Sequence, residues 1–333
     1  MQKLFVVTGG NGYIGSHFCR LVVEKGYLPL IIDDFSTSPI KPTHQFGEFY
    51  QGKISDPEIW NKIAKRGNIE AVFHFAARAL VGESEDKNKH WDYLDTNVSQ
   101  TIKMLEEISK NKIKNIIFSS SCATFGLTKE SKISENHPQN PVNTYGFSKY
   151  LVEQILKDLA RKKMLRSVVL RYFNASGASH DGLLGENHDP ETHLIPNVIK
   201  SILNKNKTKN TLQVFGNNFP TSDGTCIRDY IHVEDLALAH WKAYEYLLEN
   251  QNMYYDDFNL GSESGTSILE LIAIMEKVVS EKIQYEIKPP REGDPPILVS
   301  DSRKARSLLK FIPSKSIENS LVDAYNYLKK GML

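Results

Sequence analysis

The chain of 333 residues is poor in cysteine: its three cysteines, Cys19, Cys122 and Cys226, are far apart and form no Cys-x-x-Cys pair. A sparse, odd number argues against a disulfide-stabilised secreted domain and is typical of a reducing compartment. An excess of one charge is also lacking, since 41 Lys and Arg stand against 40 Asp and Glu and leave a formal net charge of +1. This balance excludes the electrostatic footprint of a protein that binds nucleic acid or an anionic membrane.

Long apolar runs are missing as well. No segment approaches the roughly 18 apolar residues that a membrane span needs, and the N-terminal run LFVVT is too short for a signal peptide. We therefore expect a cytoplasmic protein without a membrane or nucleic-acid partner. The composition, 40% hydrophobic and 24% charged, is that of an ordinary folded chain. At about 150 residues per domain, the length suggests two structural units.

Short apolar runs alternate with longer helical segments through the first half of the chain. The expected strands cover 4–8, 28–32, 71–75, 115–119 and 167–171, and the expected helices cover 12–25, 92–110 and 145–161. This alternation predicts β-α-β units and therefore a parallel sheet. Because the strands are apolar throughout, we expect helices on both faces of the sheet.

The rhythm changes after about Tyr172, where loops multiply and the expected helices at 233–248, 267–279 and 317–330 are widely spaced. We predict an α/β fold in which residues 1–173 form a doubly wound parallel sheet of the Rossmann type. Residues 174–333 would form a smaller mixed α/β substrate lobe, from which a segment at about 225–260 returns to the first domain. Because ligands of such sheets bind at the carboxyl ends of the strands, the lobe would supply the other wall of a cleft.

A glycine-rich turn follows the first expected strand. The sequence TGGNGYIG places Gly9, Gly12 and Gly15 three residues apart and leads into a helix. Such a turn lets the backbone approach a pyrophosphate at the helix N-terminus. Asp33 ends the second strand, where a carboxylate accepts hydrogen bonds from a ribose and repels a 2′-phosphate, and Asp34 could share that contact. The pattern favours NAD over NADP, and a tight turn without a ligand is the alternative.

Tyr145 and Lys149 are four residues apart on an expected helix and therefore share a face. A phenol has an unperturbed pKa near ~10, so a nearby ammonium and a nicotinamide cation would favour the phenolate that a base needs. The spacing alone is weak evidence, because Tyr325 and Lys329 repeat it in the C-terminal helix, where we expect a surface pair. The first pair is distinguished by three serines, 119–121, at the end of the fourth strand.

Seven segments resemble, in order and spacing, the motifs of the extended short-chain dehydrogenase/reductase family, and within it those of the UDP-hexose 4-epimerases. These segments are TGGNGYIGSH, HFAARALVGES, FSSSCATFG, YGFSK, LRYFN, DGTCIRDYIHVEDLA and PREGDPP. The resemblance implies that Tyr145 takes the proton of the sugar 4-hydroxyl while the C4 hydride passes to tightly bound NAD, and that the hydride returns to the opposite face of a 4-keto intermediate. Lys149 would bind the nicotinamide ribose and lower the pKa of Tyr145, and Ser121 would hydrogen-bond the same hydroxyl. UDP-glucose and UDP-galactose would interconvert without net redox change.

The resemblance also implies two sets of binding residues. Those expected to contact NAD are Gly9, Gly12, Tyr13, Ile14, Gly15, Asp33, Asp34, Ile54, Phe75, Ala76, Ala77, Asn97, Ser119, Tyr145, Lys149 and Phe173. Those expected to contact the UDP-sugar are Ser121, Tyr145, Asn174, His193, Leu194, Phe215, Arg228, Tyr230, Arg291, Asp294 and Leu298. Arginine suits a diphosphate because its fork of donors grips phosphate oxygens. An ion pair between the lobes, through Arg228 or Asp229, is the structural alternative.

Several positions depart from the family pattern. Lys53 stands where an Asp usually contacts adenine, Ala79 where some members have a Lys that reaches the pyrophosphate, and Phe125 where a Tyr is common. Arg78 could compensate for Ala79. Leu298 falls on a gate beside the sugar C2 substituent, where a Tyr in some members excludes N-acetyl groups. Because Leu is smaller, we expect UDP-GlcNAc and UDP-GalNAc to be accepted as well.

Other functions remain open. A decarboxylase shares the cofactor, and a dehydratase would need an acid/base pair after Ser121, where Cys122 and Ala123 stand instead. A sensor of NAD(H) or nucleotide sugars that had lost catalysis would keep the fold. We expect no metal site, because His188 and His193 lack a third His or Cys at ligand spacing. The family resemblance also implies a homodimer.

Overall fold

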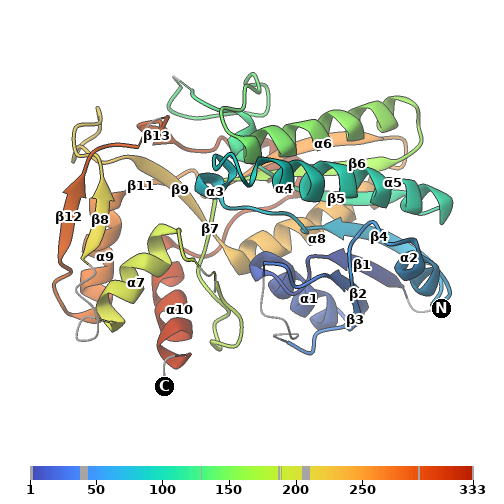
Figure 1. Cartoon of the computed structure of the whole chain (residues 1–333), viewed down its shortest axis with the longest axis horizontal. Coiled ribbons are helices and arrows are strands. Elements are labelled where there is room, and N and C mark those ends of the chain that lie inside the picture. The colour runs from blue at the N-terminus through green and yellow to red at the C-terminus, as the bar shows by residue number, and fades with distance from the viewer. Residues whose placement is uncertain are drawn as a thin grey trace.

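A fully parallel, seven-stranded sheet forms the larger part of the molecule (Figure 1), in the order β10-β6-β5-β4-β1-β2-β3. The computed structural model describes residues 3–37, 44–128, 130–186, 188, 190–204, 211–291 and 293–331. The strands of the sheet are β1 (Leu4–Thr8), β2 (Leu28–Asp33), β3 (Glu48–Gln51), β4 (Ile69–His74), β5 (Asn115–Ser121), β6 (Arg166–Tyr172) and β10 (Tyr255–Leu260).

Helices cover both faces of this sheet. Successive side chains of a strand point to opposite faces, so Phe5 and Val7 of β1 join one buried cluster while Leu4 and Val6 join another. The first cluster lies under α1 (Tyr13–Glu24) and α8 (Val233–Glu249), and the second under α2 (Pro57–Ala64), α5 (Gln100–Lys110) and α6 (Thr144–Arg161). The prediction of a doubly wound parallel sheet is confirmed.

The expected helix at 92–110 is present but is not one regular helix. It consists of α4 (His90–Leu94), a π-helical turn (Asp95–Ser99) and α5. The wide turn brings Asn97 inward, where its amide donates to Ser148 Oγ at 2.9 Å and to the carbonyl of Arg78 at 3.0 Å. Such insertions often occur beside functional sites.

The smaller lobe is built from short strands and three helices. One sheet contains β7 (Asn174–Ser176), β9 (Ile227–His232), β11 (Gly265–Ser267) and β13 (Ile297–Leu298), and a second pairs β8 (Leu212–Phe215) with β12 (Tyr285–Lys288). The helices are α7 (Leu194–Leu203), α9 (Ile268–Val279) and α10 (Ile317–Lys330). They enclose a separate apolar core that includes Val198, Met275 and Leu321. The remaining short elements are α3 (Val81–Ser84), a 3₁₀ turn (Cys122–Thr124) and a π-helical turn (Ala305–Leu309).

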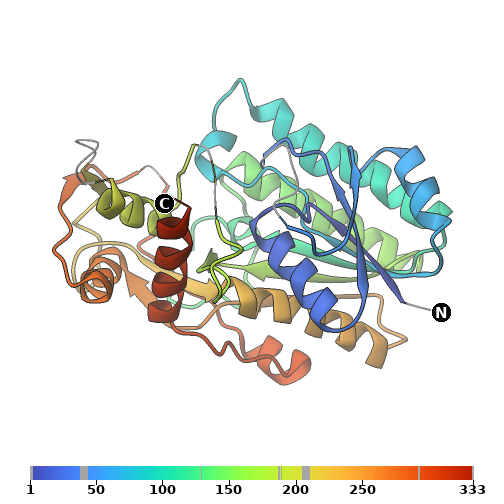
Figure 2. The ribbon, with the colours of Figure 1, turned by 90° about the horizontal axis from the view of Figure 1, so that it is seen from below.

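The chain returns from the smaller lobe to the large sheet. After β9, helix α8 packs beside α1, as Figure 2 shows, and β10 then pairs in parallel with β6 at the sheet edge. Strand β10 reads YDDFNL, with only its last three residues buried. Its acidic start explains why the apolar pattern does not reveal it.

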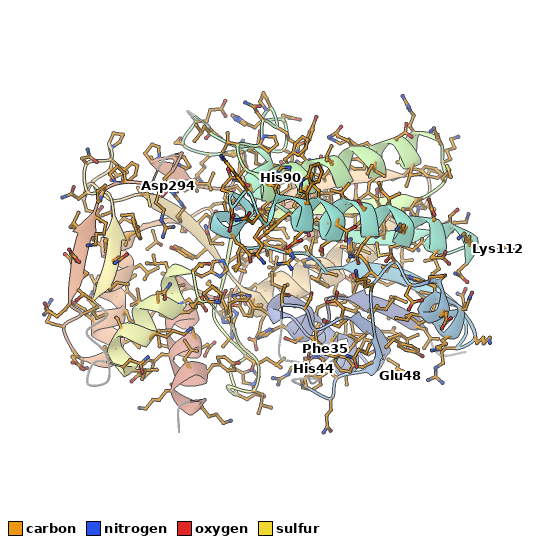
Figure 3. The ribbon with its side chains drawn as sticks, in the orientation of Figure 1. Phe35, His44, Glu48, His90, Lys112 and Asp294 are labelled. Atoms are coloured by element: carbon orange, nitrogen blue, oxygen red, sulfur yellow. The ribbon has the colours of Figure 1, made fainter. Side chains whose placement is uncertain are left out.

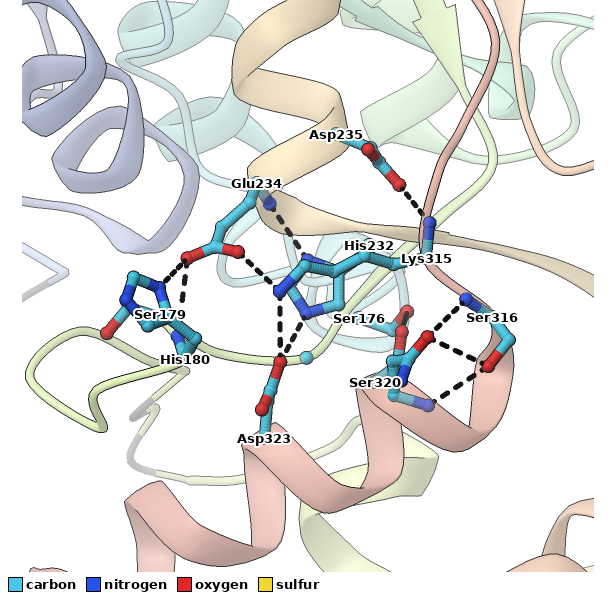
Figure 4. A network of polar contacts seen from close by, with 12 residues as sticks. Ser176, Ser179, His180, His232, Glu234, Asp235, Lys315, Ser316, Ser320 and Asp323 are labelled. Carbon is cyan, nitrogen blue, oxygen red and sulfur yellow. Dashed lines mark hydrogen bonds and ion pairs between the residues drawn. The ribbon is translucent and has the colours of Figure 1, made fainter.

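A network of polar side chains ties α10 to the start of α8 (Figure 4). Lys315 Nζ lies 2.5 Å from Glu234 Oε2 and 3.2 Å from Asp323 Oδ2, and His232 Nε2 lies 3.2 Å from the same Asp323 oxygen. Gly177 has a φ of +88°, and a Cβ there would lie 2.5 Å from His232 Nε2. Only glycine fits this approach. Among the described residues, no helix is both long and apolar enough to cross a bilayer.

Candidate active site

The glycine-rich turn closes tightly between β1 and α1. A Cβ at Gly9, whose φ is +69°, would lie 2.6 Å from the backbone nitrogen of Ala76, and one at Gly15 would lie 2.2 Å from the carbonyl oxygen of Gly9. Gly12 is the N-cap of α1 and provides no side-chain cap. The first N–H groups of α1 therefore remain available to an anion such as a pyrophosphate. Ile14 lies in this first turn and packs against the core.

Asp33 ends β2 at the carboxyl edge of the sheet and is 8% exposed. Its two oxygens accept hydrogen bonds from the backbone of Asn11 and Phe35, both at 2.9 Å. Burial raises its pKa, although these N–H groups oppose the rise. The carboxylate is thus fixed beside the glycine turn, where ribose hydroxyls would lie. Asp34 is exposed and accepts from the backbone of Ser36 at 3.0 Å.

Other residues that the resemblance assigns to NAD make contacts within the protein. The backbone N–H groups of Phe75 and Ala76, just after β4, donate to the carbonyl of Thr8, and Ala77 follows half-buried. The hydroxyl of Tyr13 donates to the carbonyl of Gly177 at 2.7 Å. Ile54 is buried, and its carbonyl accepts a hydrogen bond from Trp60 Nε1 at 2.8 Å. Both donors of the Asn97 amide are used within the protein, so Asn97 fixes the Arg78 backbone and α6.

The structure shows the surroundings of the positions that depart from the family pattern. Arg78 is directed to carboxylates, with its guanidinium 3.7 Å from Glu83 and 3.9 Å from Asp92. Phe125 is fully buried, and the guanidinium of Arg171 lies 5.3 Å from its ring centroid. An aromatic ring without a hydroxyl suits this position. Lys53 is exposed.

Tyr145, Lys149 and Ser121 meet at the carboxyl end of β5, against the first turns of α6. Tyr145 and Lys149 are 6% and 3% exposed, and the ammonium lies 5.8 Å from the centroid of the tyrosine ring. Lys149 Nζ donates to the carbonyl of Ser119 at 2.8 Å. The Ser121 side chain is near enough to the Tyr145 phenol to affect its pKa. The three residues that the sequence singled out therefore share one buried site.

Burial dominates the protonation of this site. It raises the pKa of Tyr145 far above 10, and the neighbouring Ser121 side chain only partly opposes the rise. Burial lowers the pKa of Lys149 from 10.5 to about 7, against the attraction of Glu153. The sequence argument expected a lowered pKa for Tyr145. The protein's own groups have the opposite effect, because desolvation disfavours the phenolate more than its neighbours favour it.

The smaller lobe brings several expected substrate residues together. Arg228 Nη2 lies 3.2 Å from Asp294 Oδ1, and the guanidinium of Arg291 lies 4.1 Å from the centroid of the Phe215 ring. Figure 3 shows Asp294 on the smaller lobe. The ion pair of Arg228 is thus made within the smaller lobe, not between the two lobes.

Asp229 makes no ion pair with the described residues. It is fully buried and accepts hydrogen bonds from Ser262, Glu263 and Ser300, so it orders the strand that presents Arg228 and Tyr230. Asn174 donates to the carbonyl of Asp229 at 2.9 Å. Burial raises the pKa of Tyr230 well above 10.

Leu298 packs against a small apolar cluster that contains Cys122 and Phe173, directly beyond Ser121. His193 and Leu194 lie at the start of α7, with His193 as its N-cap residue. His193 forms a very short contact with Glu186.

Residues 5–261 match the NAD dependent epimerase/dehydratase family. A UDP-glucose 4-epimerase from Lactobacillus helveticus is 40% identical over 97% of this chain and 96% of its own length. The chain belongs to the NAD dependent epimerase/dehydratase family.

Solved structures of this family are also similar to the chain. One is a UDP-glucose-4-epimerase from Stenotrophomonas maltophila with bound NAD and formylated UDP-arabinopyranose, with a TM-score of 0.93 and 32% identity over 98% of both chains. Another is a UDP-glucose 4-epimerase from Brucella ovis in complex with NAD, with a TM-score of 0.89 and 39% identity over 98% of both chains.

Sequence reasoning missed a buried network behind the site of this family member. Ser120 donates to Glu153 Oε1 at 2.5 Å, and Arg171, 1% exposed, binds Glu153 and Asp257 at 2.6 and 2.8 Å. Glu153 follows Tyr145 by eight residues on the same helix face, which is the signal that could have indicated it.

Ser119 has a partner on the opposite face of the sheet. Its hydroxyl lies 2.7 Å from His240 Nε2, while His240 Nδ1 lies 2.8 Å from the carbonyl of Leu236. Burial lowers the pKa of His240 to about 4, so its ring is neutral. It donates from Nδ1 and accepts the Ser119 proton at Nε2. Ser119 and Ser120 thus point to opposite faces of the sheet, as neighbouring residues of a strand do.

Proposed function

We propose that this protein interconverts UDP-glucose and UDP-galactose by inverting the configuration at C4. The convergence of Tyr145, Ser121 and Lys149 at the carboxyl end of β5, beside the glycine turn of an NAD-dependent family, carries this proposal. The relatives and solved structures named as UDP-glucose 4-epimerases support the choice of substrate.

The residues at the carboxyl edge of the sheet fit NAD. The uncapped N-terminus of α1 suits its pyrophosphate, and Asp33 suits a ribose. When bound, NAD supplies reversible hydride acceptance. We assign NAD binding to residues 1–173 together with α8 and β10, which come from the segment at about 225–260. We assign binding of the UDP-sugar to the remaining lobe.

Tyr145 is the proposed base that removes the proton of the 4-hydroxyl and later returns it. Ser121 hydrogen-bonds the same oxygen and holds it against the phenol. The Lys149 ammonium donates one hydrogen bond to the Ser119 carbonyl. Because an ammonium has three N–H groups, it can donate another hydrogen bond to a ribose hydroxyl. Because the resting phenol is a weak base, added positive charge beside it is needed for proton transfer.

The smaller lobe supplies the proposed grip on UDP. The guanidinium of Arg291 lies 4.1 Å from the centroid of the Phe215 ring, and Arg228 lies two residues before Tyr230 on β9. A diphosphate would bind these forks of donors, and Asn174 and Leu194 would line the nucleotide. Asp294, which pairs with Arg228, would orient that guanidinium.

A dehydratase is disfavoured, because Cys122 and Ala123 in the 3₁₀ turn after Ser121 leave these two positions without an acid/base side chain. A non-catalytic sensor is disfavoured by the intact Tyr145, Lys149 and Ser121.

The deciding experiment incubates the purified protein with UDP-galactose without added NAD and analyses both sugar and cofactor. UDP-glucose with retained NAD⁺ supports the proposal. Accumulated NADH with a released keto-sugar would identify an oxidoreductase. An unchanged sugar would favour a sensor, or a decarboxylase, whose substrate must carry a carboxylate that UDP-galactose lacks.

The N-acetylated sugars UDP-GlcNAc and UDP-GalNAc are proposed as further substrates, because Leu298, which is smaller than Tyr, packs against the cluster that contains Cys122, the residue after Ser121. Leu298→Tyr places a larger side chain at this position. It should remove activity on the acetylated pair while preserving activity on the plain sugars. Equal loss on both pairs would contradict a gate at this position.

A cytoplasmic homodimer is also proposed. Three exposed apolar side chains project from neighbouring helices: Trp91 on α4, Ile102 on α5 and Phe147 on α6 are 74%, 40% and 42% exposed. His90 lies 3.1 Å from Thr144 and so connects α4 to α6, and Figure 3 shows it beside these helices. Phe147→Glu should convert a dimer to a monomer in light scattering.

The three buried free cysteines suit a reducing compartment.

A further inference from the structure

The loop between β7 and α7 gathers four side chains that the proposed reaction does not use as a group. We call Glu186, His188, Glu191 and His193 the His-Glu cluster. Each offers one potential ligand atom, and these four atoms all lie within 4.8 Å of one another. The sequence argument against a metal counted only His and Cys, so it overlooked both carboxylates.

Two distances within the cluster are close to those between ligands of one ion, whereas His193 and Glu186 form a direct hydrogen bond that an ion would replace. His188 Nδ1 lies 3.2 Å from Glu186 Oε1, His193 Nδ1 is in very close contact with the same oxygen, and His193 Nδ1 lies 3.8 Å from Glu191 Oε1. Ligands bound tetrahedrally to zinc at about 2.0 to 2.2 Å lie roughly 3.3 to 3.6 Å from one another. Small side-chain adjustments would therefore place all four around a common centre.

Two buried atoms of the cluster lack hydrogen-bond partners among the described residues: His188 Nδ1 and Glu191 Oε2. His188 Nδ1 is close to Glu186 but lacks hydrogen-bond geometry. The Glu191 side chain is only 4% exposed, and within the described part of the chain Oε2 has an ion pair with Lys200 Nζ, at 3.8 Å. Buried polar atoms are normally satisfied, so these two indicate a ligand.

We propose that the His-Glu cluster binds one divalent transition-metal ion of the zinc class. Two imidazoles favour such an ion over Mg²⁺ or Ca²⁺, which prefer oxygen ligands. Four protein ligands without an open position are typical of a structural site. The ion would cross-link the loop just before α7, whose first residues we assign to the nucleotide. His193, 47% exposed, gives the ion access from solvent.

The surroundings suggest what this cross-link stabilises. The loop is already held at its start, where Tyr13 of α1 donates to Gly177 and where Gly185 lies against the ring of Tyr327 of α10. The described residues between Gly185 and α7 belong to no helix or strand. A metal ion would link Glu186 and His188 to Glu191 and His193, and would thereby support the start of α7 at the proposed substrate site.

The test uses the full-length protein with its bound cofactor, dialysed against a chelator. Zinc is titrated in competition with a chromophoric chelator, and bound metal is counted by mass spectrometry. We expect one equivalent per chain, no competition by Mg²⁺, and a tetrahedral visible spectrum without a thiolate charge-transfer band when Co²⁺ replaces zinc. His188→Ala and Glu191→Gln should each weaken binding about a hundredfold or more.

His180→Ala is the matched control, because this exposed histidine of the same loop pairs with Glu234 outside the cluster. It should bind zinc as the unaltered protein does. Absence of a stoichiometric equivalent, equal affinity in the His188 and His180 variants, or a cobalt–thiolate band from the buried cysteines would overturn the proposal. If a cluster variant fails to fold, the cobalt spectrum of the unaltered protein decides.

Discussion

Lys149 Nζ donates a hydrogen bond to the carbonyl oxygen of Ser119 at 2.8 Å, across the gap between α6 and the end of β5. This bond fixes the ammonium at the strand that also presents Ser121. Its nitrogen remains 5.8 Å from the centroid of the Tyr145 ring. The lysine therefore acts on the phenol through its charge and position, without a described hydrogen bond between the two.

The first prediction concerns the assigned base. Tyr145→Phe should lower turnover of UDP-galactose by about 10²- to 10⁴-fold, because proton transfer loses its positioned group. NAD content, measured after denaturing the protein, should remain unchanged. Tyr325→Phe is a matched control, since Lys329 lies 5.5 Å from the Tyr325 ring centroid in α10. Its activity should equal that of the unaltered enzyme, and equal losses in both variants would refute the assignment.

The glycine turn gives a second prediction. Gly15→Ala should abolish retention of NAD, because the added Cβ would lie 2.2 Å from the carbonyl oxygen of Gly9 and would force the turn open. Gly82→Ala is the control, since a Cβ there meets nothing within 4 Å. Cofactor content by absorbance and turnover would be compared. A Gly15→Ala protein that purifies with a full complement of NAD would show that this turn does not hold the pyrophosphate.

The buried pair of Glu153 and Arg171 gives a third prediction. Glu153→Gln should lower the free energy of unfolding by roughly 3 kcal/mol, because it leaves a buried guanidinium with Asp257 as its only described carboxylate partner. Urea denaturation measures this change. Asp158→Asn, on the exposed face of the same helix, removes a surface pair with Lys162 and should have little effect. A similar response of both variants would contradict the importance of the buried pair.

A fourth prediction follows from the pKa of Lys149, which burial lowers from 10.5 to about 7. Between these two values the unfolded chain binds a proton that the folded protein does not. The contribution of Lys149 to the free energy of unfolding therefore rises as the pH increases from about 7 to about 10.5, by up to about 1.4 kcal/mol per pH unit. Below pH 7 both states are protonated and the contribution is flat.

Lys149→Met should remove this rise. The measurement compares urea denaturation of NAD-free protein and variant across this pH range, with Lys329→Met, an exposed lysine on α10, as control. If the difference in the free energy of unfolding between the Lys149→Met and unaltered proteins does not change with pH, the prediction that burial lowers the pKa of Lys149 is wrong.

Much of the fold follows from local sequence patterns. The apolar runs at 4–8 and 115–119 lie within strands of the parallel sheet, and the glycine spacing indicates the turn that the structure forms. These features depend on side-chain periodicity and backbone sterics within a few residues. Strand β10 and the π-helical turn were missed because pairing at a sheet edge and the inward direction of Asn97 are decided by distant contacts.

The site divides in the same way. The sequence by itself determined that Tyr145 and Lys149 share a helix face, that glycines line the turn before α1, and that Asp33 ends the second strand. Only the tertiary structure decided that Lys149 bonds to Ser119, that Arg171 joins Glu153 to Asp257, and that carboxylates and imidazoles of one loop converge. The physical reason is that helical spacing is a local property, whereas burial, desolvation and polar partners depend on which segments the folded chain brings together.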